Sequence, residues 1–262
     1  MYNIVIQSVQ RAIHILNLFS FNKPRLGISE IGRSLNLPKG TVQGLVRTLA
    51  YGGFLQQDKE TRKYQLGLKI YELGTILAGS LEINQKASNP AHQLAKRTRH
   101  LVRIAILNDY TTLVTMDAYP RSLPFLSRHL GARVPLYCTA LGKALLAFLD
   151  QKEINTYIKQ VELIPYTSKT ITLKSQLLKE LRETRKRGYS INREEHLLAR
   201  AAIGAPIFGR EGHPVASICI VADPSQITGE KIQRLAKEVI ATALEISQMM
   251  GFSPQFKHFQ YK

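Results

Sequence analysis

The segment from residue 38 to residue 51 combines side chains that read DNA bases with the spacing of an amphipathic helix. Gln43 can form two hydrogen bonds with adenine, and Arg47 can do so with guanine or bind a phosphate. Two glycines lower helix propensity by about 1 kcal/mol each relative to alanine, a cost that close approach to DNA would offset. The polar face therefore predicts base contacts, and it comprises Lys39, Gly40, Thr41, Gln43, Gly44 and Arg47.

Basic residues around this segment suit contacts to the DNA backbone. Lys59 and Arg62 lie in a polar stretch typical of a hairpin tip, and Arg25 and Ser29 precede the segment. Residues 1–67 hold nine Lys and Arg against three acids, so positive charge is denser there than in the remainder, which holds 27 against 16. The alternative interpretation is a small helical domain whose basic face is only solvated.

Hydrophobic spacing predicts the elements that hold these residues. Three helices and a two-stranded hairpin are expected, over about 8–20, 28–35, 38–51 and 54–67. This order is typical of a winged helix-turn-helix domain, which we assign to residues 1–67. A linker helix follows over 68–82, and its apolar positions exceed what one small domain would cover, which predicts a partner helix.

Beyond residue 82, helical and strand-like patterns mix, as in an α+β domain. Asn89-Pro90 is read as a break before a helix over 91–100. Further helices are expected over 140–149, 151–160, 174–187 and 228–250, and strands over 101–107, 111–118, 189–192, 203–208 and 215–222. We therefore expect a second domain over 83–251, followed by an aromatic and basic tail, 252–262, to which no function is assigned.

Composition excludes several protein classes. The chain has 262 residues, with 36 Lys and Arg against 19 Asp and Glu, and the net charge of +17 favours polyanionic partners. Its hydrophobic content of 44% is normal for a folded core, which disfavours disorder. No apolar run reaches about 18 residues, so no membrane span is expected. The N-terminus lacks the pattern of a secretion signal and only two cysteines are present, which predicts a cytoplasmic protein.

No constellation of catalytic or metal-binding residues stands out. Seven histidines are scattered without the spacing of metal ligands. Glu194 and Glu195, adjacent on a predicted strand, should point to opposite faces and make no catalytic pair. Lys143 is read as a structural lysine near carbonyls rather than a Schiff-base nucleophile, and Cys138 and Cys219 as packing residues rather than a redox switch. No catalytic residue, metal site or cofactor is therefore expected.

Ordered motifs in both domains resemble the IclR family of bacterial transcription regulators. They are Ser8-Val9-Gln10-Arg11-Ala12, Ile28-Ser29-Glu30-Ile31 and Leu37-Pro38-Lys39-Gly40-Thr41-Val42 in the first domain, and 135–147, Arg187-Gly188-Tyr189 and 205–208 in the second. The resemblance covers about residues 7–250 and implies a winged-helix reader, a linker helix and a GAF-like effector-binding domain with a central antiparallel sheet. It further implies a dimer or tetramer that binds palindromic operator DNA and responds to a small carboxylate.

The resemblance also implies where the effector binds. Ala140 and Leu141 match positions whose backbone holds the acid group of the ligand at a helix N-terminus. Four further positions line the pocket in relatives, some of which carry an acid, a cysteine and two serines there; in this chain they are Asn192, Ala202, Cys219 and Val221. The pocket should therefore be more apolar and take a larger or aromatic acid. Arg200 has two equally weighted interpretations, an anion-pairing pocket residue or a surface arginine.

Three functions are open on the sequence. The favoured one is a ligand-responsive transcription regulator, a repressor of a catabolic operon. The second is an enzyme that turns over its ligand, although no nucleophile–base pair or phosphate-binding loop supports it. The third is a non-specific DNA-binding protein with a vestigial effector pocket, which uniform affinity across DNA sequences and a steep salt dependence would reveal.

Overall fold

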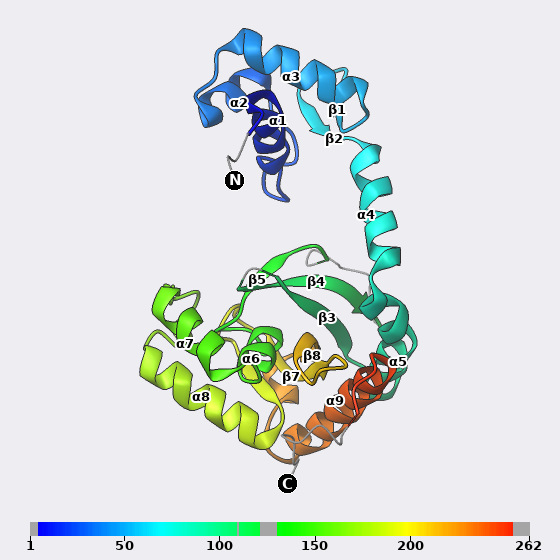
Figure 1. Ribbon diagram of the computed structural model, residues 1–262, viewed down its shortest axis with the longest axis vertical. Helices are drawn as coiled ribbons and strands as arrows, with labels where there is room; N and C mark the ends of the chain where they lie inside the picture. Colours follow the sequence, from blue (N-terminus) through cyan, green and yellow to red (C-terminus); the bar gives the residue numbers. More distant parts are fainter. Residues whose placement is uncertain (1–4, 109, 121–129, 254–262) are drawn as a thin grey trace. The chain divides into compact units, whose positions relative to one another are not determined.

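The computed structural model describes residues 5–108, 110–120 and 130–253 of the chain. The chain forms two compact units, Met1–Ser80 and Leu81–Lys262, whose elements are drawn in Figure 1. None of the helices in the described ranges combines the length and the apolar character that crossing a bilayer requires.

The first unit is a winged helix-turn-helix domain followed by a further helix (Figure 1). Its elements are α1 (Gln7–Asn17), α2 (Ile28–Leu35), α3 (Lys39–Tyr51), β1 (Leu55–Gln57), β2 (Tyr64–Leu66) and α4 (Leu68–Ser80). The first three helices and the hairpin enclose a core that includes Ile15, Ile31, Val42, Val46 and Tyr64. The predicted elements of this unit are confirmed, although α1 ends three residues before the predicted residue 20.

A close backbone contact fixes the hairpin on the end of α3. The N–H of Gly67 donates to the carbonyl of Phe54 at 2.8 Å, and a Cβ on Gly67 would lie 2.1 Å from the carbonyl oxygen of Gly53. Only glycine fits at this position. The return strand of the wing and the start of α4 are therefore held at a set place beside the recognition helix.

The second unit is built on one six-stranded sheet. The strand order is β5-β4-β3-β8-β7-β6, and every neighbouring pair is antiparallel. The elements are α5 (Glu82–Thr98), β3 (Leu101–Asn108), β4 (Thr111–Ala118), β5 (Arg133–Pro135), α6 (Ala140–Leu146), α7 (Gln151–Gln160), α8 (Lys174–Arg187), β6 (Ser190–Arg193), β7 (Ala201–Phe208), β8 (Pro214–Ala222), the 3-10 turn η1 (Pro224–Gln226) and α9 (Gly229–Met249). The predicted α+β class with an antiparallel sheet in the second domain is confirmed.

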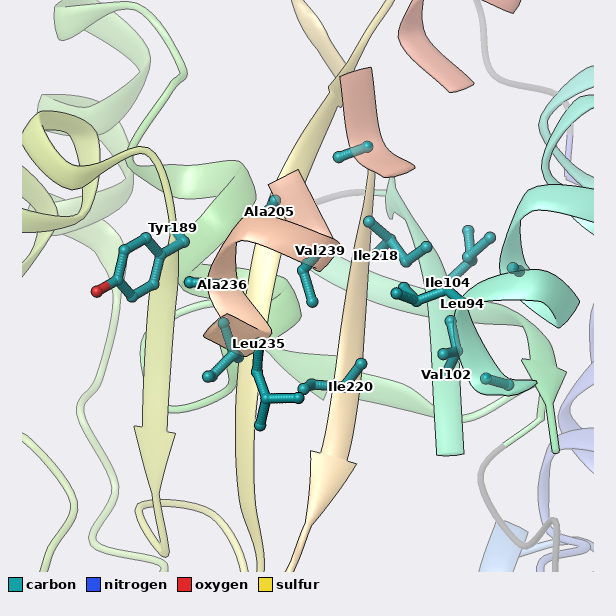
Figure 2. Packing of buried hydrophobic residues seen from close by; sticks show 14 of the residues in the cluster. Leu94, Val102, Ile104, Tyr189, Ala205, Ile218, Ile220, Leu235, Ala236 and Val239 are labelled. Atoms are coloured by element: carbon teal, nitrogen blue, oxygen red, sulfur yellow. The ribbon is translucent and has the colours of Figure 1, made fainter. Parts of the chain in front are cut away.

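The two faces of this sheet have different covers. On one face, α5 and α9 pack on the strands, and Figure 2 shows Leu94 and Val239 of these helices beside Ile104 and Ile218 of the sheet. On the opposite face, Ala140 and Leu141 at the start of α6 pack against β3 and β8. Helices α7 and α8 join α6 in a second apolar cluster. The sheet therefore separates a helix-covered core from a face that α6 covers only in part.

Two expectations for this unit are corrected. The helix predicted over 91–100 begins at Glu82 and runs through Pro90. Pro90 is buried between Ala87 and Ala91, which pack in the main core, so burial offsets the roughly 3 kcal/mol that an internal proline costs. Strand β5, at the edge of the sheet, was not predicted, because three residues are too few to show an alternation of apolar and polar side chains.

The start of the predicted tail is part of the fold. Phe252 is buried, and its ring lies 5.3 Å from that of Phe208. Residues 254–262, the rest of the predicted tail, lie outside the described part of the chain.

Candidate functional site

Helix α3 presents the predicted base-reading residues on its outer side. Its core side is set by Val42 and Val46, which are fully buried. Nothing among the described atoms lies within 4 Å of where a Cβ on either glycine of the outer side would stand. Of the six predicted residues, Thr41 and Gln43 are half-buried at the flanks, and the exposed ones are Lys39, Gly40, Gly44 and Arg47. The helix thus offers an open strip for close approach of a groove edge.

Tyr51 belongs to this strip and was not among the predicted contacts. It follows Arg47 by one turn and is 97% exposed. A fully exposed tyrosine at the end of a recognition helix offers both a ring and a hydroxyl to a DNA backbone. Its signal in the sequence is the four-residue spacing from Arg47, which places it on the outer side rather than the core side of the helix.

The wing is held in shape by hydrogen bonds at its tip and base. The carboxylate of Asp58 accepts hydrogen bonds from the backbone N–H of Thr61 at 2.8 Å and from the Thr61 hydroxyl at 2.7 Å. The hydrogen bond from the backbone N–H is the main cause of the lowered pKa of Asp58. Arg62 takes a left-handed conformation (φ 57°) that turns the strand back. Lys59 and Arg62 are both exposed there, as is Ser29 at the start of α2. The tip therefore presents two cations on a fixed turn.

Arg25 joins the wing to the segment before α2. Its Nε donates to the Oε1 of Gln65 at 3.2 Å, and its guanidinium lies 3.4 Å from the carboxylate of Asp58. The predicted role of Arg25 in contacting DNA remains a prediction. The structure adds that this side chain ties the segment before α2 to β2 and to Asp58 at the tip of the hairpin, so it also orients the wing.

A cavity of about 440 Å³ lies in the second unit, between the sheet and the start of α6. The structure brings all seven predicted effector-binding residues to its walls: Ala140, Leu141, Asn192, Arg200, Ala202, Cys219 and Val221. They come from α6, from strands β6 to β8 and from the loop before β7. What these residues bind remains a prediction.

The loop that opens α6 is clamped to the sheet. Thr139 caps the helix, because its Oγ1 accepts from the amide of Gly142 at 3.0 Å and donates to the carbonyl of Pro135 at 2.8 Å. A Cβ on Gly142 would lie 2.4 Å from the Cα of Leu136, so only glycine fits. From the sheet, the amide of Asn192 donates to the carbonyl of Cys138. Asn192 therefore supports the pocket wall as well as lining it.

Lys143 and the two adjacent glutamates differ from expectation. Strand β6 ends at Arg193, so Glu194 and Glu195 do not lie on a strand. Lys143, 1% exposed, donates to both carboxylate oxygens of Glu195 at 2.7 and 2.9 Å and lies 3.4 Å from Glu180. Burial raises the pKa of Glu195, and Lys143 opposes that rise. The lysine is thus a structural residue, but its partners are carboxylates rather than carbonyls.

Arg103 is a pocket residue that the sequence analysis missed. Its Nε and Nη2 donate to the two carboxylate oxygens of Asp117 at 2.7 and 3.0 Å, and the hydroxyl of Tyr119 donates to the same carboxylate at 3.3 Å. Arg103 and Tyr119 both line the cavity. Burial opposes the charge on Arg103, but the bonds to Asp117 prevail and raise its pKa. The available signal was a single arginine within the apolar run of β3.

Both cysteines should be chemically inert in the folded protein. Cys138 and Cys219 are buried, and burial raises the pKa of each thiol to about 12. Because the thiolate is the reactive species, we expect Ellman's reagent at pH 8 to titrate neither thiol in native protein and both in urea. Fast labelling of native protein would contradict this expectation and revive the redox-switch interpretation.

Comparison with known proteins identifies both units. Residues 8–59 match the IclR helix-turn-helix domain, and residues 76–248 match the family described as bacterial transcriptional regulator IclR C-terminal. The chain is 32% identical to the HTH-type transcriptional regulator KipR of Bacillus subtilis, over 94% of this chain and 98% of that one.

No cluster of three or more His, Cys, Asp or Glu that could hold a metal ion occurs in the described ranges.

Solved structures share the fold. The IclR structure from Thermotoga maritima is 32% identical to this chain, with a TM-score of 0.76 over 94% of this chain and 99% of that one. An IclR homologue from Microbacterium hydrocarbonoxydans, solved in complex with 4-hydroxybenzoate, is 20% identical, with a TM-score of 0.80 over 93% and 99% of the two chains. The second likeness is one of fold alone.

Proposed function

The chain belongs to the IclR family of bacterial transcription regulators, and we propose that it is a repressor that binds a palindromic operator under the control of a small carboxylate. Membership makes it a DNA-binding regulator rather than an enzyme. The observation that carries the rest is the open outer strip of α3 beside a wing with two exposed cations. Gln43 and Arg47 would contact base edges, and Lys59 and Arg62 would contact phosphates.

The chemistry of the cavity supports an aromatic or larger aliphatic acid as the effector. Cys219, Val221 and Ala202 make its floor apolar. Its volume of about 440 Å³ falls in the range of small-molecule sites. The 4-hydroxybenzoate complex of a homologue with the same fold agrees with an acid of this size. In this proposal the carboxylate lies against the backbone at Ala140 and Leu141.

The exposed apolar side chains of α4 support a homo-oligomer, a dimer or a dimer of dimers. No residue of this helix is buried. Leu73 and Leu77 follow one another by one turn and are 44% and 58% exposed. A helix that is rich in exposed apolar residues and not covered by the described part of its chain is expected to pair with a second helix. The same helix of a second copy would cover it symmetrically.

Operator binding tests the proposal. The purified chain is mixed, at physiological salt and with excess competitor DNA, with the intergenic DNA beside its own gene, and a site is selected from random DNA if no shift appears. We expect a specific complex that an aromatic or aliphatic acid releases or tightens. Repression predicts that the bound protein lowers transcription from that DNA in vitro. Uniform affinity for all sequences with a steep salt dependence would favour the non-specific alternative instead.

Two variants of α3 test the recognition helix. Gln43→Ala and Arg47→Ala should each weaken operator binding by about 1–3 kcal/mol for each lost base contact and relax specificity at one position. Arg182→Ala is the matched control, because it removes one exposed positive charge from α8 in the second unit. If both α3 variants bind a mapped operator as tightly as the wild type, the assignment of the recognition face is wrong.

A further inference from the structure

The cavity has a polar end that the family resemblance did not indicate. Arg103 on β3 and Tyr119 after β4 line this end, and both donate hydrogen bonds to the carboxylate of Asp117 on β4. The side chains of the arginine and the aspartate are 11% and 3% exposed. Burying a charge pair so deeply costs desolvation energy. Its position beside a ligand cavity therefore suggests that the pair takes part in ligand binding.

A β-bulge lies beside this pair and sets which face of the sheet Asp117 occupies. Ile104 pairs with Met116 but the next residue, Ala105, pairs with Val114, so Thr115 is an extra residue in β4. Side chains alternate between the faces of a sheet, and the extra residue shifts that alternation by one. Asp117 therefore lies on the same side of the sheet as Val114, paired with Arg103. If β4 alternated regularly through Thr115, Asp117 would instead face the apolar core under α5 and α9.

Sheet register places Arg103 two strands away from Gly204, the residue that lies against Ala140 of α6. Arg103 pairs with Cys219, and Cys219 pairs with Gly204. Gly204 lies against the start of α6, where its missing Cβ would stand 2.9 Å from the carbonyl oxygen of Ala140. Neighbouring strands are about 4.8 Å apart, so Arg103 and Gly204 are separated by about twice that distance, with the apolar Cys219 between them.

The guanidinium group has hydrogen-bonding capacity left for a ligand. Of its hydrogen bonds to described side chains, both go to Asp117, from Nε and Nη2. An arginine has five N–H groups, so the two on Nη1 and the second on Nη2 remain beyond those that bond to Asp117, in a residue that lines the cavity. Because Asp117 balances the charge of Arg103, a second carboxylate brought here would meet the negative charge of Asp117. A hydroxyl or carbonyl oxygen would not.

We propose that Arg103 binds an uncharged oxygen of the effector, so that the effector is a hydroxy or oxo acid whose second oxygen lies at the opposite end from its carboxylate. This inference rests on the proposed function, because it takes the cavity to be the effector site. Asp117 and Tyr119 are positioning residues that fix the guanidinium. The effector is then polar at both ends and apolar between them, in agreement with the floor at Cys219 and Val221.

Calorimetry with matched acids tests this assignment on the full chain. One series is benzoate, 4-hydroxybenzoate and terephthalate, and the other is hexanoate, 6-hydroxyhexanoate and adipate. In the series that binds, we expect the hydroxy acid to bind about tenfold more tightly than the parent acid or the diacid. Each series differs only in the group at the far end, so wild-type protein alone provides the primary result.

Two variants locate the preference. Arg103→Met should abolish the advantage of the hydroxy acid over the parent acid. Asp117→Asn keeps the shape of the side chain but leaves the charge of Arg103 unbalanced, so the diacid should now bind about tenfold more tightly than the hydroxy acid. The control is Arg97→Met, which removes an exposed ion pair with Glu238 on the helix-covered face. Circular dichroism checks that each variant is folded.

The outcomes separate this inference from the proposed function. Binding of parent and hydroxy acid with equal affinity by the wild type would overturn the role of Arg103 while leaving the regulator and its acid effector in place. An unchanged preference in folded Arg103→Met protein would do the same. If no acid of either series binds while specific operator binding is intact, the acid class itself is wrong, and the inference falls with it.

Discussion

Replacement of Lys143 by methionine is expected to lower the free energy of unfolding by about 3–5 kcal/mol. The variant leaves the carboxylate of Glu195 buried without its partner, whereas Glu180 keeps its bond to Arg187 at 2.7 Å. Urea denaturation followed by circular dichroism measures the change. The matched control is Lys169→Met, which removes the exposed partner of the neighbouring Glu194 and should leave stability nearly unchanged, because water screens exposed ion pairs.

The cost of Lys143→Met should depend on pH with a defined sign. Burial raises the pKa of Glu195, and loss of the opposing ammonium group should raise it further in the folded state. A raised folded pKa means that the fold prefers the protonated carboxyl, so its stability is lost as pH rises through that pKa. The difference from wild type should therefore be larger at pH 8 than near pH 5. Glu195→Gln in the same variant should recover part of the loss.

An effect of less than about 1 kcal/mol, or a larger cost at pH 5 than at pH 8, would contradict this account. Such a result would mean that Glu195 reaches water or another cation once Lys143 is gone. Because the pair joins α6 to the segment after β6, the variant also reports whether the pocket wall depends on it, and effector affinity measured in parallel gives the answer.

Replacement of Leu77 by lysine on α4 is expected to separate the subunits and lower operator affinity by about 10²–10⁴-fold. The reason is that a dimer engages two half-sites, so the second contact is intramolecular, and a monomer loses that advantage. Sedimentation measures the assembly and a gel shift measures the affinity. Thr75→Lys is the matched control, because helical spacing places residue 75 on the side of α4 opposite Leu77.

The folded state of the single DNA-binding unit should be unaffected by this change, since Leu77 is 58% exposed and no residue of α4 is buried. Unchanged assembly and affinity in Leu77→Lys protein would show that the copies meet through another surface. An equal loss in both variants would instead indicate a general effect of substitution in α4 rather than loss of one specific contact.

Sequence periodicity was sufficient for most of the fold. The buried Val42 and Val46 recur at helical spacing, and the glycines after Tyr51 and the polar tip around Asp58 mark the wing. Local patterns determine such elements, so the sequence alone predicts them. The helix through Pro90 is different, because only the sheet that buries its neighbours makes the proline tolerable, and no local pattern records that contact.

Some residues of the pocket could be predicted from the sequence and others could not. The residues around Ala140 belong to a recognisable motif, so they could be placed from resemblance. Arg103 and Asp117 are fourteen residues apart and meet only through strand pairing. A prediction from regular alternation of side chains puts Asp117 on the wrong face of β4, because it does not account for the extra residue, Thr115. The acidic partner of a buried arginine was therefore beyond prediction from the sequence.

That extra residue has an evolutionary consequence. Thr115 stands outside the pairing of β4 with β3, so a chain without it would keep Val114, Met116 and Asp117 on their present faces. The strand can therefore gain or lose one codon at this point without exchanging the residues of the cavity and the core. Relatives whose fourth strand is one residue shorter should keep the same cavity lining, and alignments should place their gap at position 115.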